Sequence, residues 1–282
     1  MDLCGHFEYD GILSRKYGLV FANVEVDRFT ALSGTVQHKS FFNKSSGKRY
    51  HMEDDLSDSP FSFDVEIITD DESVINTVNR REIERWLFDK NNYCRLYLDP
   101  EDDEFNDSIE LVNGEQKRLY LNCKFFNPKK IEYNGGVVGY QCTLEADSGY
   151  WHQDAIVQTF VLNNDTPQND MTFTINIDTD LTEYIYPNIK FTTSSKTSSD
   201  VSITNLTDSR DRVTQFRQLD TGVEVYLDGE IRALTTSSNE IDSYNDLWSS
   251  RNFPRLLNGE NEIQVRGSVA SITFEWSARR RF

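Results

Sequence analysis

Residues 253–282 read FPRLLNGENEIQVRGSVASITFEWSARRRF, and this stretch decides the fold. Apolar and polar residues alternate over 262–267 and again over 271–276, which is the period of a half-buried β-strand. Phe253 and Pro254 predict a turn ahead of the first strand, and Asn258 with Gly259 predicts a corner that needs positive φ. We therefore expect the two strands to form a closing hairpin. Its buried side chains should be Leu256, Leu257, Ile263, Val265, Ile272, Phe274 and Trp276.

The same pattern extends back through the C-terminal half of the chain. From about residue 155, short alternating segments recur roughly every 10–20 residues, a spacing typical of an antiparallel β-sandwich. Cysteine and histidine are absent after His152. We predict a C-terminal domain over 155–282 that the final hairpin closes, preceded by a separate domain over 1–154.

One stretch of the N-terminal half has the period of a helix. Residues 69–90 read TDDESVINTVNRREIERWLFDK, with acids at the start and Lys90 at the end, as the helix dipole favours. We predict one amphipathic helix over 74–89, packed on the N-terminal sheet, with Arg80, Arg81, Glu84 and Arg85 on its wetter face. Its apolar side chains, spaced three to five residues apart, are Ile75, Val78, Ile83, Trp86 and Leu87.

The rest of the N-terminal half predicts strands and turns. Asn134 and Gly135 lie between two apolar runs, which is a hairpin signal. Residues 43–60 are polar and rich in turn formers, so they predict a long exposed loop or a hairpin. The expected strands lie at 18–26, 61–69, 93–99, 117–126, 130–136 and 137–147.

Charge and hydropathy exclude several classes of function. The formal net charge is −18, and both halves are acidic. Nucleic-acid binding needs a basic face that contacts phosphates, so we expect no sequence-specific nucleic-acid partner. No apolar run approaches the roughly 18 residues of a membrane span, so we expect no membrane insertion. The first residues, MDLCGHFEYDG, contain acids and no apolar core, which argues against a secretory signal.

Catalytic and metal-binding patterns are also missing from the sequence. The stretch DPEDDE (99–104) lacks the alternating spacing and central glycine of a calcium loop, which favours a solvated acidic turn. The four cysteines form no CxxC pair and are expected to be reduced core residues. No HExxH, nucleophile-elbow or phosphate-loop motif occurs, and nothing selects one carboxylate pair for glycoside hydrolysis. We expect no enzyme activity, no cofactor and no metal.

Several stretches resemble one known family. REIERWLF (81–88), YCRLYLD (93–99) and GYQCTLEADSGYW (139–151) resemble the N-terminal half of distal tail proteins of long-tailed bacteriophages. VEVYLDGE (223–230), FPRLLNGENEIQVRG (253–267) and ITFEW (272–276) are similar to its closing strands. The resemblance implies a mainly β protein, with a sandwich or barrel-like N-terminal ring domain containing one helix. It also implies a galectin-like antiparallel C-terminal β-sandwich.

The same resemblance implies a structural role in the virion. The family forms a homohexameric ring at the baseplate, which joins the tail tube to the tail tip or adhesion device and lets DNA pass. The implied partners are further copies of the chain, the tail tube protein, a hub or tail-tip protein, and receptor-binding or adhesion proteins. The protein would be assembled in the cytoplasm of the host bacterium and reside at the tail tip.

Two alternatives and one local question remain open on the sequence. A free carbohydrate-binding β-sandwich module for host-surface attachment would account for the C-terminal half, but it would not need the helix-bearing domain. A tail-tip glycan hydrolase would need an acid–base pair that the sequence does not single out. Arg279, Arg280 and Arg281 form either a solvated end or a contact for an acidic neighbouring subunit.

Overall fold

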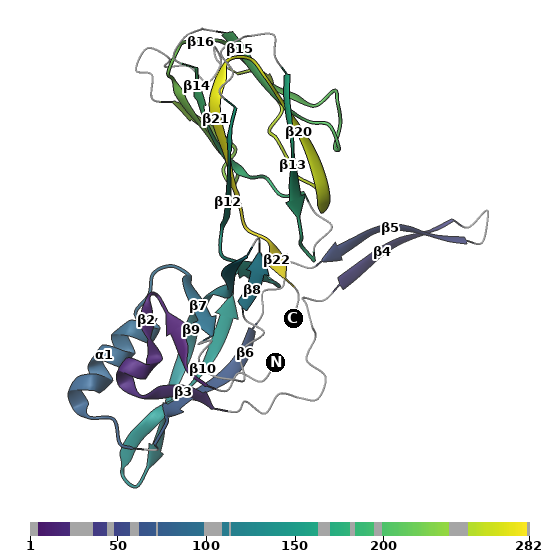
Figure 1. Ribbon diagram of the computed structural model, residues 1–282. Coiled ribbons are helices and arrows are strands. Elements are labelled where there is room, and N and C mark those ends of the chain that lie inside the picture. Colours follow the sequence, from purple (N-terminus) through teal and green to yellow (C-terminus); the bar gives the residue numbers. More distant parts are fainter. Residues whose placement is uncertain are drawn as a thin grey trace. The chain divides into compact units, whose positions relative to one another are not determined.

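The computed structural model describes residues 5–22, 36–43, 48–56, 62–71, 73–98, 109–112, 114–162, 170–180, 184–194, 199–236 and 248–280. The chain divides into two compact units (Figure 1). The first is Met1–Asp154 together with Arg279–Phe282, and the second is Ala155–Ala278. The predicted second domain, 155–282, therefore extends too far, because the end of the chain returns to the first unit.

A ten-stranded antiparallel sheet forms the body of the first unit. Seven strands follow the order β2-β1-β7-β9-β10-β6-β3, while β8 pairs with β9, and β11 pairs with β9 and β22. Gly5 and Phe21 exchange backbone hydrogen bonds of 3.1 and 2.8 Å, which joins the segment before β1 to β3 and closes the sheet into a barrel-like arrangement. The strands are β1 (Phe7–Tyr9), β2 (Ile12–Leu13), β3 (Leu19–Ala22), β6 (Ser62–Thr69), β7 (Cys94–Leu98), β8 (Ile109–Val112), β9 (Glu115–Tyr133), β10 (Gly136–Ala146), β11 (Trp151–Gln153) and β22 (Arg279–Arg280).

The predicted helix is present but shorter than expected. Helix α1 spans Thr77–Phe88, and its N-cap residue Asn76 accepts a hydrogen bond from the N–H of Asn79 at 2.8 Å. A four-residue 3-10 helix at Ser14–Tyr17 is the other helical segment within the described residues. Ile83, Trp86 and Leu87 of α1 are buried in the core of this unit, and Ile75 is buried although it lies before the cap.

Val78 contradicts the prediction that it packs on the sheet, because it is 68% exposed. At 3.6 residues per turn, Val78 lies about 140° around the helix from Ile83 and about 180° from Leu87. Three-to-five residue spacing therefore does not place all five predicted apolar positions on the same face of the helix.

Two hairpins in the first unit agree with the sequence. Asn134 and Gly135 adopt φ values of 50° and 81° between β9 and β10, as a two-residue hairpin turn requires. Strands β4 (Val36–Asn43) and β5 (Lys48–Leu56) pair as a separate two-stranded sheet, so the polar stretch at 43–60 contains part of a hairpin. The acidic stretch at 99–104 lies outside the described residues.

The second unit is the predicted β-sandwich, built from two five-stranded antiparallel sheets. Their orders are β12-β21-β14-β17-β18 and β13-β20-β15-β16-β19. Aromatic rings from the two sheets meet between them: Phe160 stacks on Phe173 at 3.8 Å, and Phe191 lies 5.4 Å from Phe216. The strands are β12 (Ile156–Val161), β13 (Asp170–Ile177), β14 (Asn188–Thr193), β15 (Ser199–Asn205), β16 (Val213–Leu219), β17 (Glu224–Asp228), β18 (Ala233–Thr236), β19 (Trp248–Arg251), β20 (Gly259–Arg266) and β21 (Val269–Trp276).

The predicted closing hairpin is wrong in its pairing. Strand β20 pairs with β13 and β15, whereas β21 pairs with β12 and β14, so the two strands belong to different sheets. Gly267 joins them with φ 104°, and a Cβ there would lie 2.1 Å from the carbonyl oxygen of Asp200. The alternation of buried residues is as expected, but it reflects two central strands that face each other across the core.

Candidate assembly surfaces

The end of the chain is anchored within the first unit by an ion pair between a buried arginine and a half-buried glutamate. Arg280 on β22 donates from Nε to both oxygens of Glu110 on β8, at 2.8 and 2.9 Å. The side-chain amide of Gln153 on β11 also donates to Glu110. Arg280 is buried and β22 pairs with β11 in the register Trp151–Arg280. Arg280 therefore fits neither expectation for the three terminal arginines: its side chain is not solvated, and it is not available to contact a neighbouring subunit.

Arg279 is half-buried and its guanidinium lies 4.8 Å from the ring centroid of Tyr150. This cation–π contact adds to the β22–β11 pairing rather than leaving the side chain in solvent. Arg281 lies outside the described residues.

A cluster of buried and half-buried aromatic and charged side chains lies beside Asp154, at the end of the first unit. Tyr97 and Tyr120 lie 5.3 Å apart, and the Arg118 guanidinium lies 4.2 Å from the Tyr97 ring centroid. The Tyr97 hydroxyl donates to Asp154 at 2.8 Å, and the second oxygen of Asp154 accepts from the N–H of Arg118 at 3.2 Å. Burial, together with the bond to Asp154, raises the pKa of Tyr97 to about 12. These contacts fix Asp154, the last residue before the second unit.

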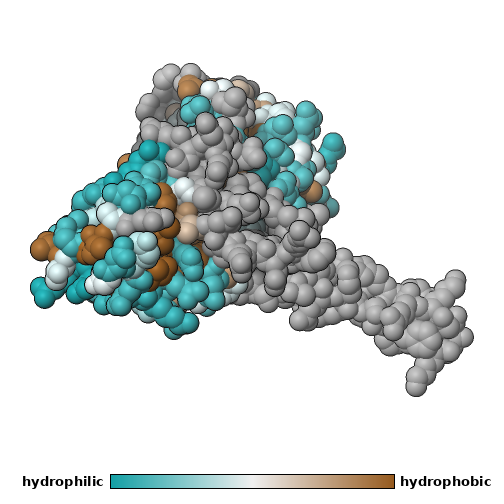
Figure 2. All heavy atoms as spheres, turned by 90° about the horizontal axis from the view of Figure 1, so that it is seen from below, coloured by the Kyte–Doolittle hydropathy of each residue, from teal (hydrophilic) through white to brown (hydrophobic). Residues whose placement is uncertain are grey.

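Exposed apolar side chains gather where α1 begins. Val74 and Val78 are 54% and 68% exposed, and Tyr133 at the end of β9 is 55% exposed. A Cβ on Gly136 would lie 2.3 Å from Val74, so Val74 packs beside the β9–β10 turn. Figure 2 shows hydrophobic atoms on the side of the first unit that carries α1. Apolar surface of this kind marks a candidate contact surface.

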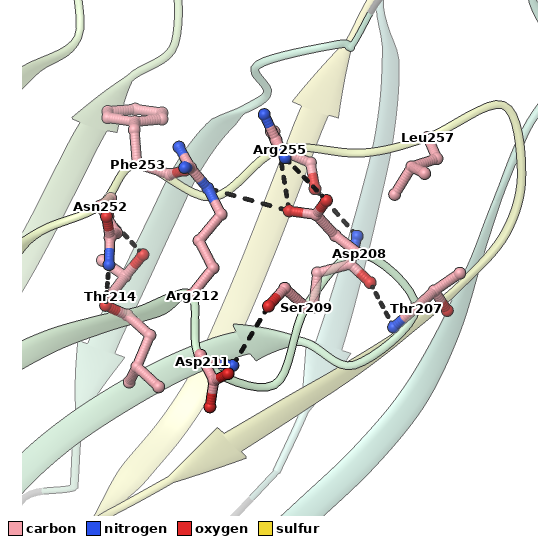
Figure 3. A network of polar contacts seen from close by, with 12 residues as sticks. Thr207, Asp208, Ser209, Asp211, Arg212, Thr214, Asn252, Phe253, Arg255 and Leu257 are labelled. Carbon is pink, nitrogen blue, oxygen red and sulfur yellow. Dashed lines mark hydrogen bonds and ion pairs between the residues drawn. The ribbon is translucent and has the colours of Figure 1, made fainter.

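The turn at Phe253–Pro254 in the second unit is held by a polar network (Figure 3). Arg255 donates to both oxygens of Asp208, at 2.8 and 2.9 Å, and the Nε of Arg212 lies 3.8 Å from the same carboxylate. Arg212 also donates to the carbonyl oxygen of Phe253 at 3.1 Å. Phe253 and Pro254, which the sequence predicted as a turn, are both buried. The side chain of Asp208 is only 5% exposed, so this pair is internal to the loop.

The remaining positions of this segment follow the prediction with one exception. Leu256 is buried and exchanges backbone hydrogen bonds of 3.0 and 2.8 Å with Ile185. Leu257 is half-buried rather than buried, because it starts the corner and its N–H donates to Asn261. Gly259 has the expected positive φ, 94°. The other expected core residues, Ile263, Val265, Ile272, Phe274 and Trp276, are buried.

Two buried asparagines were missed by sequence reasoning. Asn205 donates to the carbonyl oxygen of Arg255 at 2.9 Å and to Asn261 at 2.8 Å. Asn261 donates in turn to the carbonyl oxygen of Leu257 at 2.8 Å. Neither position is among the site residues predicted from the sequence, although both satisfy backbone groups of the corner. An Asn in the second position after Gly259 is a signal that could have suggested this role.

Thiol, imidazole and carboxylate groups are the candidate metal ligands in the part of the chain that the structure describes. There, no group of three or more His, Cys, Asp or Glu side chains is placed to hold a metal ion. Cys94, Cys123 and Cys142 are free, and burial raises the pKa of Cys142 to about 12. No helix of the described residues is long and apolar enough to cross a membrane.

Comparison with known structures identifies the fold. The Dit protein of phage SPP1, described as a paradigm of the hub adsorption apparatus in phages that infect Gram-positive bacteria, is 11% identical with a TM-score of 0.64. The match covers 97% of this chain and 98% of that one. A chain of the phage p2 baseplate in its activated conformation is 9% identical with a TM-score of 0.50, and the match covers 96% of this chain and 97% of that one. The expected resemblance in fold is thereby confirmed.

Comparison at the level of sequence identifies the family. No curated protein matches the chain. A family model described as a phage tail protein N-terminal domain matches residues 3–148, and one described as a phage tail C-terminal domain matches residues 157–276. The chain therefore belongs to the family of phage tail proteins that these two domains define.

Proposed function

We propose that the protein is a distal tail protein whose first unit forms a closed homohexameric ring at the end of the phage tail. The ring joins the tail tube to the tail tip or adhesion device and lets DNA pass. The observation that carries this proposal is the likeness to the SPP1 Dit fold over nearly the whole chain, together with family matches in both halves.

Strand pairing in the first unit supports assembly with further copies. The β4–β5 hairpin pairs with no other strand among the described residues. A two-stranded hairpin is marginal by itself in water, and its open edges invite pairing with another chain. A closed ring satisfies such edges through the same contact repeated around a symmetry axis.

The charge of the chain supports a conduit for DNA. Six copies carry 6 × −18 = −108 formal charges. Acids that face a channel would repel the phosphates of passing DNA, whereas a basic lining would bind them. The ring would therefore guide DNA without holding it.

The two units have different partners in this proposal. The exposed apolar surface at Val74, Val78 and Tyr133 belongs to the first unit and offers a contact for the tube protein or a neighbouring copy. The second unit would hold the hub, receptor-binding or adhesion proteins. The protein acts as a structural part of the virion, without enzymatic turnover. Glycosidase, esterase and protease assays should stay at background, and activity that one carboxylate substitution abolishes would contradict this.

Electron microscopy tests the proposal directly. The purified protein, alone and mixed with the tail tube protein of the same phage, is imaged in negative stain and its end-on views are averaged without imposed symmetry. We expect rings with six-fold symmetry around an open channel. Single bilobed particles in both samples would contradict the proposal.

A further inference from the structure

A cluster of tyrosine and arginine side chains lies at one end of the sandwich in the second unit. It consists of Tyr184 and Tyr186, which precede β14, with Arg232 after β17 and Arg255 before β20. The Arg255 guanidinium carbon lies 3.5 Å from the ring centroid of Tyr184, and that of Arg232 lies 4.3 Å from the ring centroid of Tyr186. Tyr184 remains 41% exposed and Arg232 is exposed, so solvent reaches both a ring and a guanidinium.

The two halves of the cluster are held together by the backbone. Ile185, between the two tyrosines, exchanges two backbone hydrogen bonds with Leu256, next to Arg255. The carboxylate of Asp208 binds Arg255 through both of its oxygens. Arg255 and Tyr184 are therefore fixed before any ligand arrives, which reduces the entropy cost of binding.

Arg232 is held in a conformation that its residue type disfavours. Its φ is 52°, in the left-handed region that is uncommon for residues other than Gly, Asn and Asp. The preceding turn is fixed by Asp228, whose carboxylate accepts the N–H groups of Glu230 and Ile231 at 3.0 and 3.1 Å. A strained backbone persists when the surroundings determine it, and such positions cluster at ligand sites.

The charges of the cluster are only partly neutralised. Asp208 is a single carboxylate that faces both Arg255 and Arg212, at 2.8 and 3.8 Å. Among the described residues, Arg232 has no carboxylate partner; its contact is with the Tyr186 ring. Asp228 and Glu230 precede Arg232 in the same turn, so the cluster carries no excess of positive charge; it offers one exposed guanidinium without a carboxylate partner in the described part of the chain, together with an exposed aromatic ring.

We propose that this cluster binds a saccharide that carries a carboxylate or phosphate group. The sugar ring lies against Tyr184, whose exposed ring offers a flat apolar contact, and the negative group lies on the planar guanidinium of Arg232, which suits carboxylate and phosphate geometry. The acidity of the whole chain disfavours a long polyanion, so recognition is local and short-ranged. This site goes beyond the proposed ring, and rings can form whether or not it binds sugar.

Saturation-transfer NMR on the full-length protein tests the site, because it detects weak binding to a large assembly. The probes are glucose 6-phosphate, glucuronic acid and glucose, with inorganic phosphate as competitor. We expect transfer to the ring protons of either acidic sugar or both, with much less to glucose; the responding acid identifies the anionic group. The signal should fall on addition of phosphate.

Two substitutions separate recognition from folding. Arg232→Gln should weaken binding of the acidic sugar by about tenfold, as expected for loss of a hydrogen bond between charged groups. Arg217→Gln, at an exposed arginine on β16 outside the cluster, should leave binding unchanged. Arg232→Asn should also lose binding while its melting temperature stays equal or rises, because Asn tolerates the left-handed conformation.

Four results would overturn the proposal. They are equal transfer to glucose and the acidic sugars, no transfer to any sugar, unchanged binding in Arg232→Gln, and capture of a Glu-rich peptide in place of the sugars. A lower melting temperature in Arg232→Asn with unchanged sugar binding would likewise assign Arg232 a purely structural role.

Discussion

Replacing Trp86 with alanine tests how the first unit is built. Trp86 is 4% exposed, and its ring lies 5.8 Å from Phe7 with an interplanar angle of 9°. It also lies 5.5 Å from the ring of Tyr17. The indole N–H donates to the carbonyl oxygen of Tyr9 at 2.8 Å, in a buried position. One side chain thus joins α1 to β1 and to the 3-10 helix.

The cost of the substitution has two parts. Truncation of a buried aromatic residue to alanine destabilises by about 3–5 kcal/mol, through lost burial and the cavity that remains. The carbonyl oxygen of Tyr9 also loses its donor, which costs roughly 1–3 kcal/mol if no water replaces it. Because the terms overlap, we expect a loss of about 4–6 kcal/mol in the free energy of unfolding of the first unit. At about 2–4 °C per kcal/mol for a unit of this size, its melting temperature falls by roughly 10–20 °C.

Thermal and urea unfolding of the full-length chain, followed by far-ultraviolet circular dichroism at one protein concentration, measures this loss. Val78→Ala on the same helix is the matched control, and because Val78 is 68% exposed it should change stability by less than about 0.5 kcal/mol. Trp86→Phe should retain most of the packing and lose the hydrogen bond, with an intermediate effect. If Trp86→Ala also changes stability by less than about 0.5 kcal/mol, the ring is exposed in solution and belongs to an interface.

Three further predictions concern the end of the chain and the sandwich. Arg280→Ala should destabilise the first unit by about 1–3 kcal/mol, because Glu110 is left half-buried without its cation. Limited proteolysis should then cleave the C-terminal residues faster than in the unmodified protein, and an unchanged cleavage rate would contradict this. In urea titrations, Gly267→Ala should destabilise the second unit by at least about 2 kcal/mol. Gly222 also has positive φ but has open space around it, so the control Gly222→Ala should destabilise the unit by only about 1 kcal/mol. Equal effects would show that the contact with Asp200 is relaxed. Deletion of 268–282 removes β21 from between β12 and β14. The second unit should then aggregate, while the first unit loses only β22. A soluble second unit with an unchanged melting temperature would show that β21 is peripheral.

Local patterns predicted the strands better than their partners. The alternation over 262–267 and 271–276 correctly identified Ile263, Val265 and Phe274 as core residues. The same alternation arises whether two strands pair in one sheet or face each other from two sheets. The sequence pattern therefore cannot distinguish a hairpin from a connection that passes from one sheet to the other. Only the long-range register with β12 to β15 decides between them.

The helix and the arginine tip show the same limit. Spacing predicted α1 and the burial of Trp86, but a list of apolar residues did not separate Val78 from the buried face. Local sequence leaves Arg280 either solvated or in a subunit contact, because its partner, Glu110, lies 170 residues away. The contacts of Arg232 and Arg255 with tyrosines are equally non-local, so no local pattern indicates the cluster at the end of the sandwich.

The mass of the purified protein under native conditions tests the central claim most directly. One chain has a mass of 32.7 kDa, so a hexamer has a mass of 6 × 32.7 kDa, about 196 kDa. We predict that native mass spectrometry finds this hexamer, alone at high concentration or on addition of the tail tube protein. A single species of 32.7 kDa at every concentration, with and without the tube protein, would contradict the account.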